Sequence, residues 1–142
     1  MNYTEPKPLQ KGDTIAFIAP AGSILDANAI DRAKNYFENN GYNVVYSKHL
    51  FNQNKYMSDT DSNRLEDLHW AFSNKDINAI ICARGGYGCL RLINDIDYNL
   101  IKNNPKIFCG YSDITILSAM FLKKSGLITY SGPMARGDFG LE

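Results

Sequence analysis

Two apolar runs of strand length, residues 14–19 and 77–83, constrain the fold of this chain more than any other feature. A strand that is apolar along its length suits a sheet covered on both faces, as parallel sheets are. Residues 26–40 carry apolar side chains at helical spacing, with Gly41 at the position expected for a helix C-cap. Strands that alternate with helices in this way imply right-handed βαβ crossovers. We therefore predict an α/β domain with an open, mostly parallel sheet and helices on both faces.

The other elements complete a flavodoxin-like domain with about five strands. The remaining strands are expected at residues 43–47, 106–109 and 127–130. The remaining helices are expected after the capping candidates at 58–61, at 89–95, at 97–103 and after residue 112. Residues 50–60 are polar and show no periodicity, which predicts a long surface loop.

Length and charge narrow the class of protein. The chain has 142 residues, enough for one domain with a sizeable core. Its 15 basic and 15 acidic residues cancel, so it lacks the positive charge that binds nucleic acids and anionic membranes, and we expect neither as a partner. The sequence shows neither a signal peptide nor a segment of membrane-spanning length, from which we expect a cytoplasmic location.

The cysteines and histidines argue against a metal site. Cys82, Cys89 and Cys109 form no Cys-x-x-Cys pair and leave an odd count, which fits reduced thiols in a reducing compartment. The two histidines, His49 and His69, have no partner at the spacing of a metal ligand. We expect no bound metal.

The strongest candidate for chemistry is Ser112, between the strand at residues 106–109 and the helix that follows. A sharp strand-to-helix turn lifts a hydroxyl above the sheet edge and aims the amides of the first helical turn at the group that it attacks. This stretch departs from the Gly-x-Ser-x-Gly pattern, because Ile114 stands where the second glycine would be. The alternative is that Ser112 or Asp113 serves only as a helix N-cap.

A glycine-rich loop at residues 84–88 follows the strand at residues 77–83. Loops at the carboxyl ends of parallel strands share one sheet edge, so this loop can bring a backbone N–H beside Ser112. A tetrahedral oxyanion needs about two such donors, and the amide of Asp113 would be the second. Two alternatives are a tight turn without a role and a phosphate-binding loop, which an arginine at the third glycine position disfavours.

Four motifs stand in order along the chain. They are Gly12-Asp13-Thr14 with Ala19-Pro20-Ala21-Gly22, then Arg84-Gly85-Gly86-Tyr87-Gly88, then Gly110-Tyr111-Ser112-Asp113-Ile114-Thr115, and finally Gly132-Pro133-Met134. Together they resemble the N-terminal half of the LD-carboxypeptidases, a serine-peptidase family that includes the muramoyltetrapeptide carboxypeptidases and the microcin C self-immunity proteins. The resemblance covers nearly the whole chain.

The resemblance implies a Ser-His-Glu triad with Ser112 as nucleophile, the amides of Gly86 and Asp113 as oxyanion hole, and no cofactor. The histidine and glutamate of the family come from a second, C-terminal domain. Residues 1–142 are therefore expected to be the nucleophile domain without that second domain, and to be inactive alone, because a serine without a general base is a weak nucleophile.

Three residues of the glycine-rich loop are expected to contact the substrate: Arg84, Gly85 and Tyr87. Two roles stay open for Arg84 at the mouth of the site: it pairs with Asp113, or it meets a substrate carboxylate. The surface that a second domain would cover, around residues 130–139 and the turn at Ser112, would be exposed in this chain, which favours a homodimer.

By the same resemblance, the substrate is a murein tetrapeptide, from which the enzyme removes a terminal D-amino acid in peptidoglycan recycling. A close alternative is hydrolysis of a peptide–nucleotide antibiotic such as microcin C. A non-catalytic, flavodoxin-like binding module is the alternative from another class.

Overall fold

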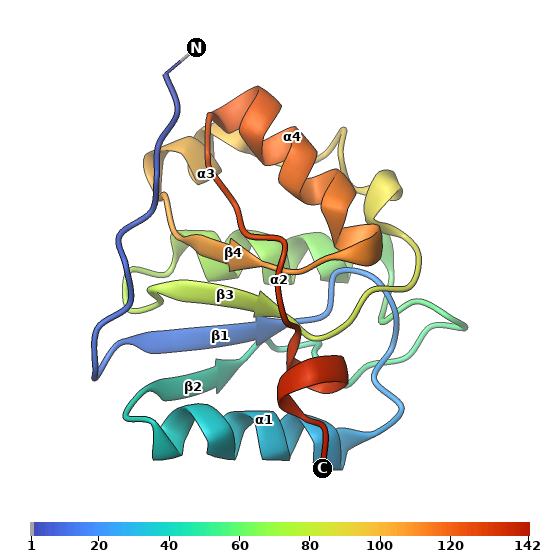
Figure 1. Cartoon of the computed structure of the whole chain (residues 1–142). Helices are drawn as coiled ribbons and strands as arrows, with labels where there is room; N and C mark the ends of the chain where they lie inside the picture. The colour runs from blue at the N-terminus through green and yellow to red at the C-terminus, as the bar shows by residue number, and fades with distance from the viewer. Residues whose placement is uncertain (1) are drawn as a thin grey trace.

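The computed structural model describes residues 2–142, which form a parallel sheet with helices on both faces (Figure 1). The sheet contains four strands in the order β2-β1-β3-β4. Their bounds are β1 (Thr14–Ile18), β2 (Asn43–Tyr46), β3 (Ala79–Cys82) and β4 (Ile107–Cys109). All three strand pairs are parallel, which confirms the expected fold class.

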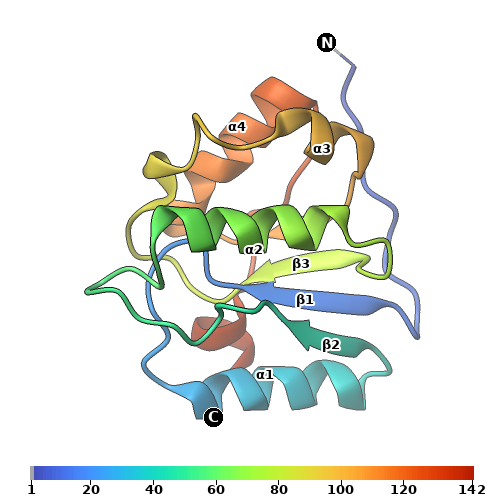
Figure 2. The ribbon, with the colours of Figure 1, turned by 180° about the vertical axis from the view of Figure 1, so that it is seen from behind.

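Helices connect the strands and divide between the two faces. Figure 2 shows α2 crossing one face, with α3 and α4 above it and α1 along the other side of the sheet. Their bounds are α1 (Ala27–Asn39), α2 (Asp61–Ser73), α3 (Tyr98–Asn103) and α4 (Thr115–Ser125). Three shorter turns are η1 (Cys89–Arg91), η2 (Ser112–Ile114) and the π-helical η3 (Ala135–Phe139).

The strands contribute side chains to two hydrophobic cores, one on each face of the sheet, because successive side chains of a strand point to opposite faces. Ile15 and Phe17 of β1 pack in the core under α1, together with Ala135 of η3. Ala16 and Ile18 of the same strand pack in the core under α2, α3 and α4. All four β1 side chains are at most 1% exposed, which explains the uninterrupted apolar sequence of this strand.

The strand order places the candidate loops beside each other. The order 2-1-3-4 is that of flavodoxin-like sheets, in which ligands bind at the carboxyl edge, at the point between β1 and β3 where the strand order reverses. Residues 20–23 leave β1 at this edge and residues 84–88 leave β3. The two loops are joined by a hydrogen bond from the Gly22 N–H to the Gly85 carbonyl, at 3.1 Å.

Two expected elements are shorter than the sequence suggested. Residues 127–130 do not form a fifth ladder strand, since they make only isolated bridges, Leu127 with Thr4 and Tyr130 with Cys109. The two ends of this segment face different neighbours, so no run of consecutive pairs develops. The helix expected at residues 89–95 is limited to the single turn η1. None of the helices in residues 2–142 combines the length and the apolar character of a membrane span.

Candidate active site

Ser112 lies on a sharp turn between β4 and α4, in a backbone conformation that a serine rarely adopts. Its φ is 61°, one of two positive values at non-glycine residues among residues 2–142, and its side chain is exposed. Gly110 makes the turn possible, because a Cβ there would lie 2.8 Å from Cγ2 of the buried Ile114. Ile114, which stands in place of the second glycine of the Gly-x-Ser-x-Gly pattern, thus packs its buried side chain against Gly110 at the start of the turn.

Helix capping does not account for Ser112 or Asp113. Neither η2 nor α4 has a side-chain cap, and among residues 2–142 the Ser112 hydroxyl makes no hydrogen bond. The Asp113 carboxylate instead accepts a hydrogen bond from the Cys89 N–H at 3.0 Å. Asp113 therefore ties the turn at Ser112 to the end of the glycine-rich loop.

The glycine-rich loop touches Ser112 directly. A Cβ added at Gly85 would lie 2.9 Å from Ser112 Cβ, 3.0 Å from Ser112 Oγ and 3.6 Å from the Asp113 nitrogen. Any side chain at residue 85 would therefore displace the serine. Gly86 has a φ of 126°, a value that residues with a side chain avoid. The close approach to Ser112 explains the glycine at position 85, and the positive φ explains the glycine at position 86.

The amides of Gly86 and Asp113 are free to donate. The Gly85 carbonyl accepts from Gly22 N–H and from Arg84 Nε, each at 3.1 Å. Because the peptide is trans, the N–H of Gly86 lies in the same plane as the Gly85 carbonyl and points in the opposite direction. Within residues 2–142, neither this amide nor that of Asp113 donates a hydrogen bond to a protein acceptor. Unpartnered donors at the first turn of a helix are available to an anion.

Arg84 and Tyr87, both in the glycine-rich loop, have different surroundings. Arg84 is partly buried, donating from Nε to the Gly85 carbonyl and from Nη1 to the Ser23 carbonyl at 3.2 Å. Arg84 does not pair with Asp113 within residues 2–142, and a contact with a substrate carboxylate stays a prediction. Tyr87 is exposed and packs edge-to-face against Tyr56, with ring centroids 5.6 Å apart.

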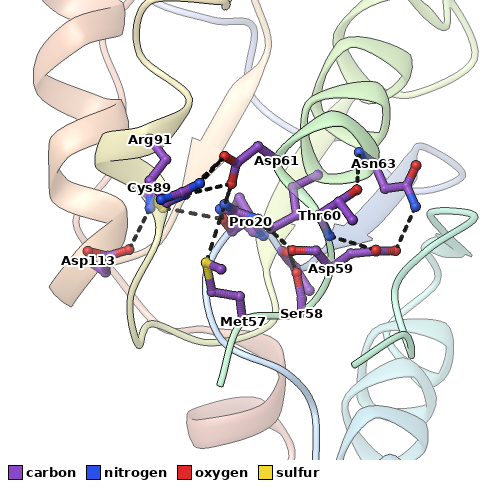
Figure 3. A network of polar contacts seen from close by, with 12 residues as sticks. Pro20, Met57, Ser58, Asp59, Thr60, Asp61, Asn63, Cys89, Arg91 and Asp113 are labelled. Atoms are coloured by element: carbon purple, nitrogen blue, oxygen red, sulfur yellow. Dashed lines mark hydrogen bonds and ion pairs between the residues drawn. The ribbon is translucent and has the colours of Figure 1, made fainter. Parts of the chain in front are cut away.

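Sequence reasoning missed a buried arginine, Arg64, that holds these loops together. Figure 3 labels its partners Pro20, Asp59 and Asp61 within the network of polar contacts. Arg64 of α2 is 1% exposed and donates to the carbonyls of Pro20 (2.5 Å) and Asp59 (3.3 Å). It also pairs with Asp61 at 2.5 Å, and Asp61 in turn binds Arg91 of η1 at 2.7 Å. The hydrogen bonds from Arg91, with those from Arg64, lower the pKa of the Asp61 carboxyl. An aspartate and an arginine three residues apart at the start of a helix usually form a surface ion pair, so the sequence carries no signal that Arg64 is buried.

The two histidines serve other contacts. His49 is buried with its Nδ1 2.8 Å from Asp67 Oδ1, and His69 Nε2 accepts from the Asp97 N–H at 3.0 Å. Burial lowers the pKa of His69. Neither contact involves Ser112. Among residues 2–142 no group of three potential metal ligands comes together.

The fold and site define a class: a doubly wound α/β domain with an exposed serine on a strained turn at the switch-point edge of the sheet. Residues 15–132 match the model of the LD-carboxypeptidase N-terminal domain. The chain therefore belongs to the LD-carboxypeptidase family.

Named relatives agree with this assignment. The chain is 44% identical, over its whole length, to a probable murein peptide carboxypeptidase of Bacillus subtilis, and covers 44% of that protein. It is 36% identical over 136 residues to the microcin C7 self-immunity protein MccF of Escherichia coli, covering 94% of this chain and 39% of MccF. A crystal structure of an MccF-like protein from Bacillus anthracis superposes with a TM-score of 0.93 at 40% identity, over 98% of this chain and 43% of that one. The chain thus spans less than half the length of these relatives.

Proposed function

We propose that this chain is the nucleophile domain of a serine-type LD-carboxypeptidase, with Ser112 as the nucleophile. The observation that carries the proposal is the exposed Ser112 at φ 61°, pressed against Gly85 and flanked by two free amides. A strained backbone at an exposed polar residue is a feature that stable folding does not require. Membership of a carboxypeptidase family gives this strain a chemical reason.

The proposed reaction is acyl transfer. Ser112 Oγ attacks the carbonyl carbon of the terminal peptide bond and loses its proton to a general base, while the carbonyl oxygen becomes an oxyanion held by the amides of Gly86 and Asp113. The intermediate collapses, the C–N bond breaks, and the leaving amine takes the proton from the base. Water then hydrolyses the acyl-enzyme by the same steps, which releases the shortened peptide and restores Ser112.

The base and its orienting carboxylate are proposed to lie outside these 142 residues. By family resemblance they are a histidine and a glutamate of a second domain. His49 and His69 have other partners, as described above. We therefore expect the 142-residue chain, on its own, to release no measurable D-alanine from murein tetrapeptide, because removal of triad members typically costs several orders of magnitude in rate.

The proposed substrate is a murein tetrapeptide, cleaved before its terminal D-amino acid during peptidoglycan recycling in the cytoplasm. The relatives named murein peptide carboxypeptidase and, in Pseudomonas aeruginosa, murein tetrapeptide carboxypeptidase support this choice. Free thiols at Cys82, Cys89 and Cys109 fit a reducing compartment. The proposed chemistry uses no metal or cofactor.

A second candidate is hydrolysis of a peptide–nucleotide. It is favoured by one finding: MccF solved in complex with aspartyl sulfamoyl adenosine superposes on 96% of this chain with a TM-score of 0.93 at 33% identity. The two candidates share the nucleophile and differ in the leaving group, which is a D-amino acid in the murein tetrapeptide and the nitrogen that carries the nucleotide in the peptide–nucleotide.

A domain exchange tests the proposal. Residues 1–142 replace the matching segment of the Bacillus subtilis relative, to which they align along their full length. The chimera is expected to release D-alanine from murein tetrapeptide, and Ser112→Ala is expected to reduce the rate by at least about 1,000-fold with an unchanged circular dichroism spectrum. Ser131→Ala, at another exposed serine, is the matched control. A Ser112→Ala chimera as active as its parent would refute the nucleophile; a peptide–nucleotide cleaved faster than the tetrapeptide would favour the second candidate.

A further inference from the structure

The side chain of Asp113 is hydrogen-bonded to the glycine-rich loop. Its Oδ2 accepts from the Cys89 N–H at 3.0 Å (Figure 3). Asp113 follows β4 and Cys89 follows β3, so this bond crosses between the loops of two neighbouring strands. The carboxylate caps neither η2 nor α4, as described above. Its observed partner is therefore the loop and not a helix.

The glycine-rich loop is hydrogen-bonded at two points. The Gly85 carbonyl accepts from the Gly22 N–H at 3.1 Å, and the Cys89 N–H donates to Asp113. Between these points, the amides of residues 86–88 donate to no protein acceptor in the part of the chain that the structure describes. Both glycines of this interval have a positive φ, 126° and 120°, and glycine is the residue with the most backbone freedom. The direction of the first amide of the interval, that of Gly86, therefore depends on how the two ends are held.

The two proposed oxyanion donors lie around Gly85. The nitrogen of Gly86 is bonded to the Gly85 carbonyl carbon. A Cβ on Gly85 would lie 3.6 Å from the Asp113 nitrogen and 3.0 Å from Ser112 Oγ. Both donors must lie about 3 Å from one oxyanion, and a misplacement of about 1 Å in an active site can cost about 100-fold in rate. The arrangement of this short stretch of loop is therefore critical.

We propose that the Asp113 carboxylate is a positioning group for the reaction: by accepting from the Cys89 N–H, it keeps the Gly86 N–H aimed at the oxyanion that the Asp113 N–H also binds. The inference rests on the proposed function, because it takes Ser112 as the nucleophile and these two amides as the oxyanion hole. Asp113 then supplies one donor through its backbone and holds the loop that supplies the other through its side chain. The role requires an acceptor oxygen and not a negative charge, so an amide oxygen at the same place can fill it.

The test measures kcat and KM separately in the Bacillus subtilis chimera described above. Asp113→Ala is expected to lower kcat for D-alanine release by about 10- to 100-fold, because one oxyanion donor is misplaced. The KM of the tetrapeptide should change far less, because the oxyanion exists only in the transition state. Asp113→Asn is expected to restore most of the lost rate. Asp113→Leu keeps the branched shape without an acceptor and is expected to restore none of it.

Asp97→Ala is the matched control. The Asp97 carboxylate also accepts one backbone N–H, from Leu100 at 2.9 Å, at the start of α3. Its removal should destabilise the fold to a comparable degree and leave kcat unchanged, because α3 carries no residue of the site. Urea unfolding of both alanine variants thus separates a loss of rate through partial unfolding from a loss through misplacement of the loop.

Amide resonances of the 142-residue chain test the same contact without any reaction. Asp113→Ala should move the Cys89 amide proton upfield, accelerate its hydrogen exchange and shift the Gly86 amide. Asp113→Asn should keep the Cys89 amide protected. Asp97→Ala should change the Leu100 amide and leave those of Cys89 and Gly86 as they are in the parent chain.

Three results would overturn the positioning role: a kcat of Asp113→Ala equal to that of its parent, an Asp113→Asn chimera as slow as Asp113→Ala, or a loss that lies entirely in KM. With an inactive Ser112→Ala chimera, any of them removes only this inference. An active Ser112→Ala chimera removes the proposed function, and the Cys89 and Gly86 amides then still decide whether the carboxylate holds the loop.

Discussion

The left-handed conformation of Ser112 has a measurable thermodynamic signature. A residue with a Cβ pays roughly 1–2 kcal/mol in this region, and glycine does not. We therefore expect Ser112→Gly to unfold at higher urea than Ser112→Ala, by about 1 kcal/mol in the free energy of unfolding. Both variants lack the hydroxyl, so the comparison isolates the backbone.

Ser131 is the matched control for that comparison, since it is exposed and its φ is not positive. There the order should reverse, with the alanine variant more stable because glycine is more flexible in the unfolded chain. Equal stabilities of Ser112→Gly and Ser112→Ala would mean that the turn relaxes in solution.

Gly85 is the residue whose substitution should disturb Ser112 most. A Cβ there would lie 2.9 Å from Ser112 Cβ, closer than two such carbons approach in proteins. We expect Gly85→Ala to lower the free energy of unfolding by about 1–3 kcal/mol and to shift the amide resonances of Ser112 and Asp113. Gly137→Ala is the control, because nothing lies within 4 Å of a Cβ at that position. Unchanged amide resonances of Ser112 and Asp113 in Gly85→Ala would contradict the close contact between Gly85 and Ser112.

At the scale of the elements, Arg64 joins the carboxyl end of β1, the start of α2 and η1. Its removal leaves the carbonyls of Pro20 and Asp59 without their donor in a buried site, and each such group costs about 1–3 kcal/mol. We expect Arg64→Met to lower the free energy of unfolding by about 2–4 kcal/mol. Amide hydrogen exchange at residues 84–89 should accelerate as well, since this loop rests on the network.

Arg91→Met provides the comparison within the same network. Both arginines bind Asp61, but the Arg91 side chain is 51% exposed, and exposed ion pairs contribute at most about 1 kcal/mol. The effect of Arg91→Met on the free energy of unfolding should therefore be much smaller than that of Arg64→Met. Equal effects of the two substitutions would show that burial of Arg64 does not matter.

The elements also show what the sequence could predict. Periodicity and apolar runs placed the four strands, and parallel topology then brought Ser112 next to the glycine-rich loop, because both follow neighbouring strands, β4 and β3. Residues 127–130 have strand composition but lack a continuous partner, which is a tertiary property. Arg64 was missed for a similar reason: a charged residue on a helix is usually solvated, and only the packing of three loops over α2 buries it.

At the scale of the whole molecule, buried thiols predict how stability depends on pH. Burial raises the pKa of Cys82 and of Cys89, so both stay neutral in the folded protein where an unfolded thiol ionises, near pH 8.5. Their contribution to stability is complete below that pH and is lost as pH rises above it. Each thiol should then lower the free energy of unfolding by about 1.4 kcal/mol per pH unit.

Urea unfolding at pH 7 and pH 10 measures this slope. Cys82→Ala should make the decrease in the free energy of unfolding between these two pH values smaller by the contribution of one thiol. This holds whatever the substitution does to stability at pH 7. Ile80→Val makes a comparable small cavity in the same strand without a titrating group, and should lower stability equally at both pH values. An unchanged slope in Cys82→Ala would mean that this thiol ionises in the folded state.

The surface expected to drive self-association is smaller than the sequence suggested. Phe139 does not project from the tail, since η3 packs on α1 and the Phe139 ring lies 4.6 Å from that of Phe37. Apolar exposure remains beside β4, at Tyr111 (41%), Ile128 (36%) and Tyr130 (40%). The segment carrying Ile128 and Tyr130 lies beside β4, because Tyr130 bridges to Cys109, and Thr4 pairs with the start of this segment, where the Ile128 N–H donates to the Thr4 carbonyl at 3.0 Å.

Exposed apolar side chains gathered beside β4 favour contact with a second copy, because association removes their surface from water. We therefore expect this 142-residue chain to form a homodimer at high concentration through the surface at Ile128 and Tyr130. The double variant Ile128→Lys/Tyr130→Lys should shift the molar mass measured by light scattering to that of a monomer, since charge on this surface opposes association. Leu25→Lys, at a leucine that is 69% exposed on the loop before α1, should leave the dimer intact. A monomeric parent chain at millimolar concentration would contradict the homodimer, and a dimer that survives the double variant would move the interface elsewhere.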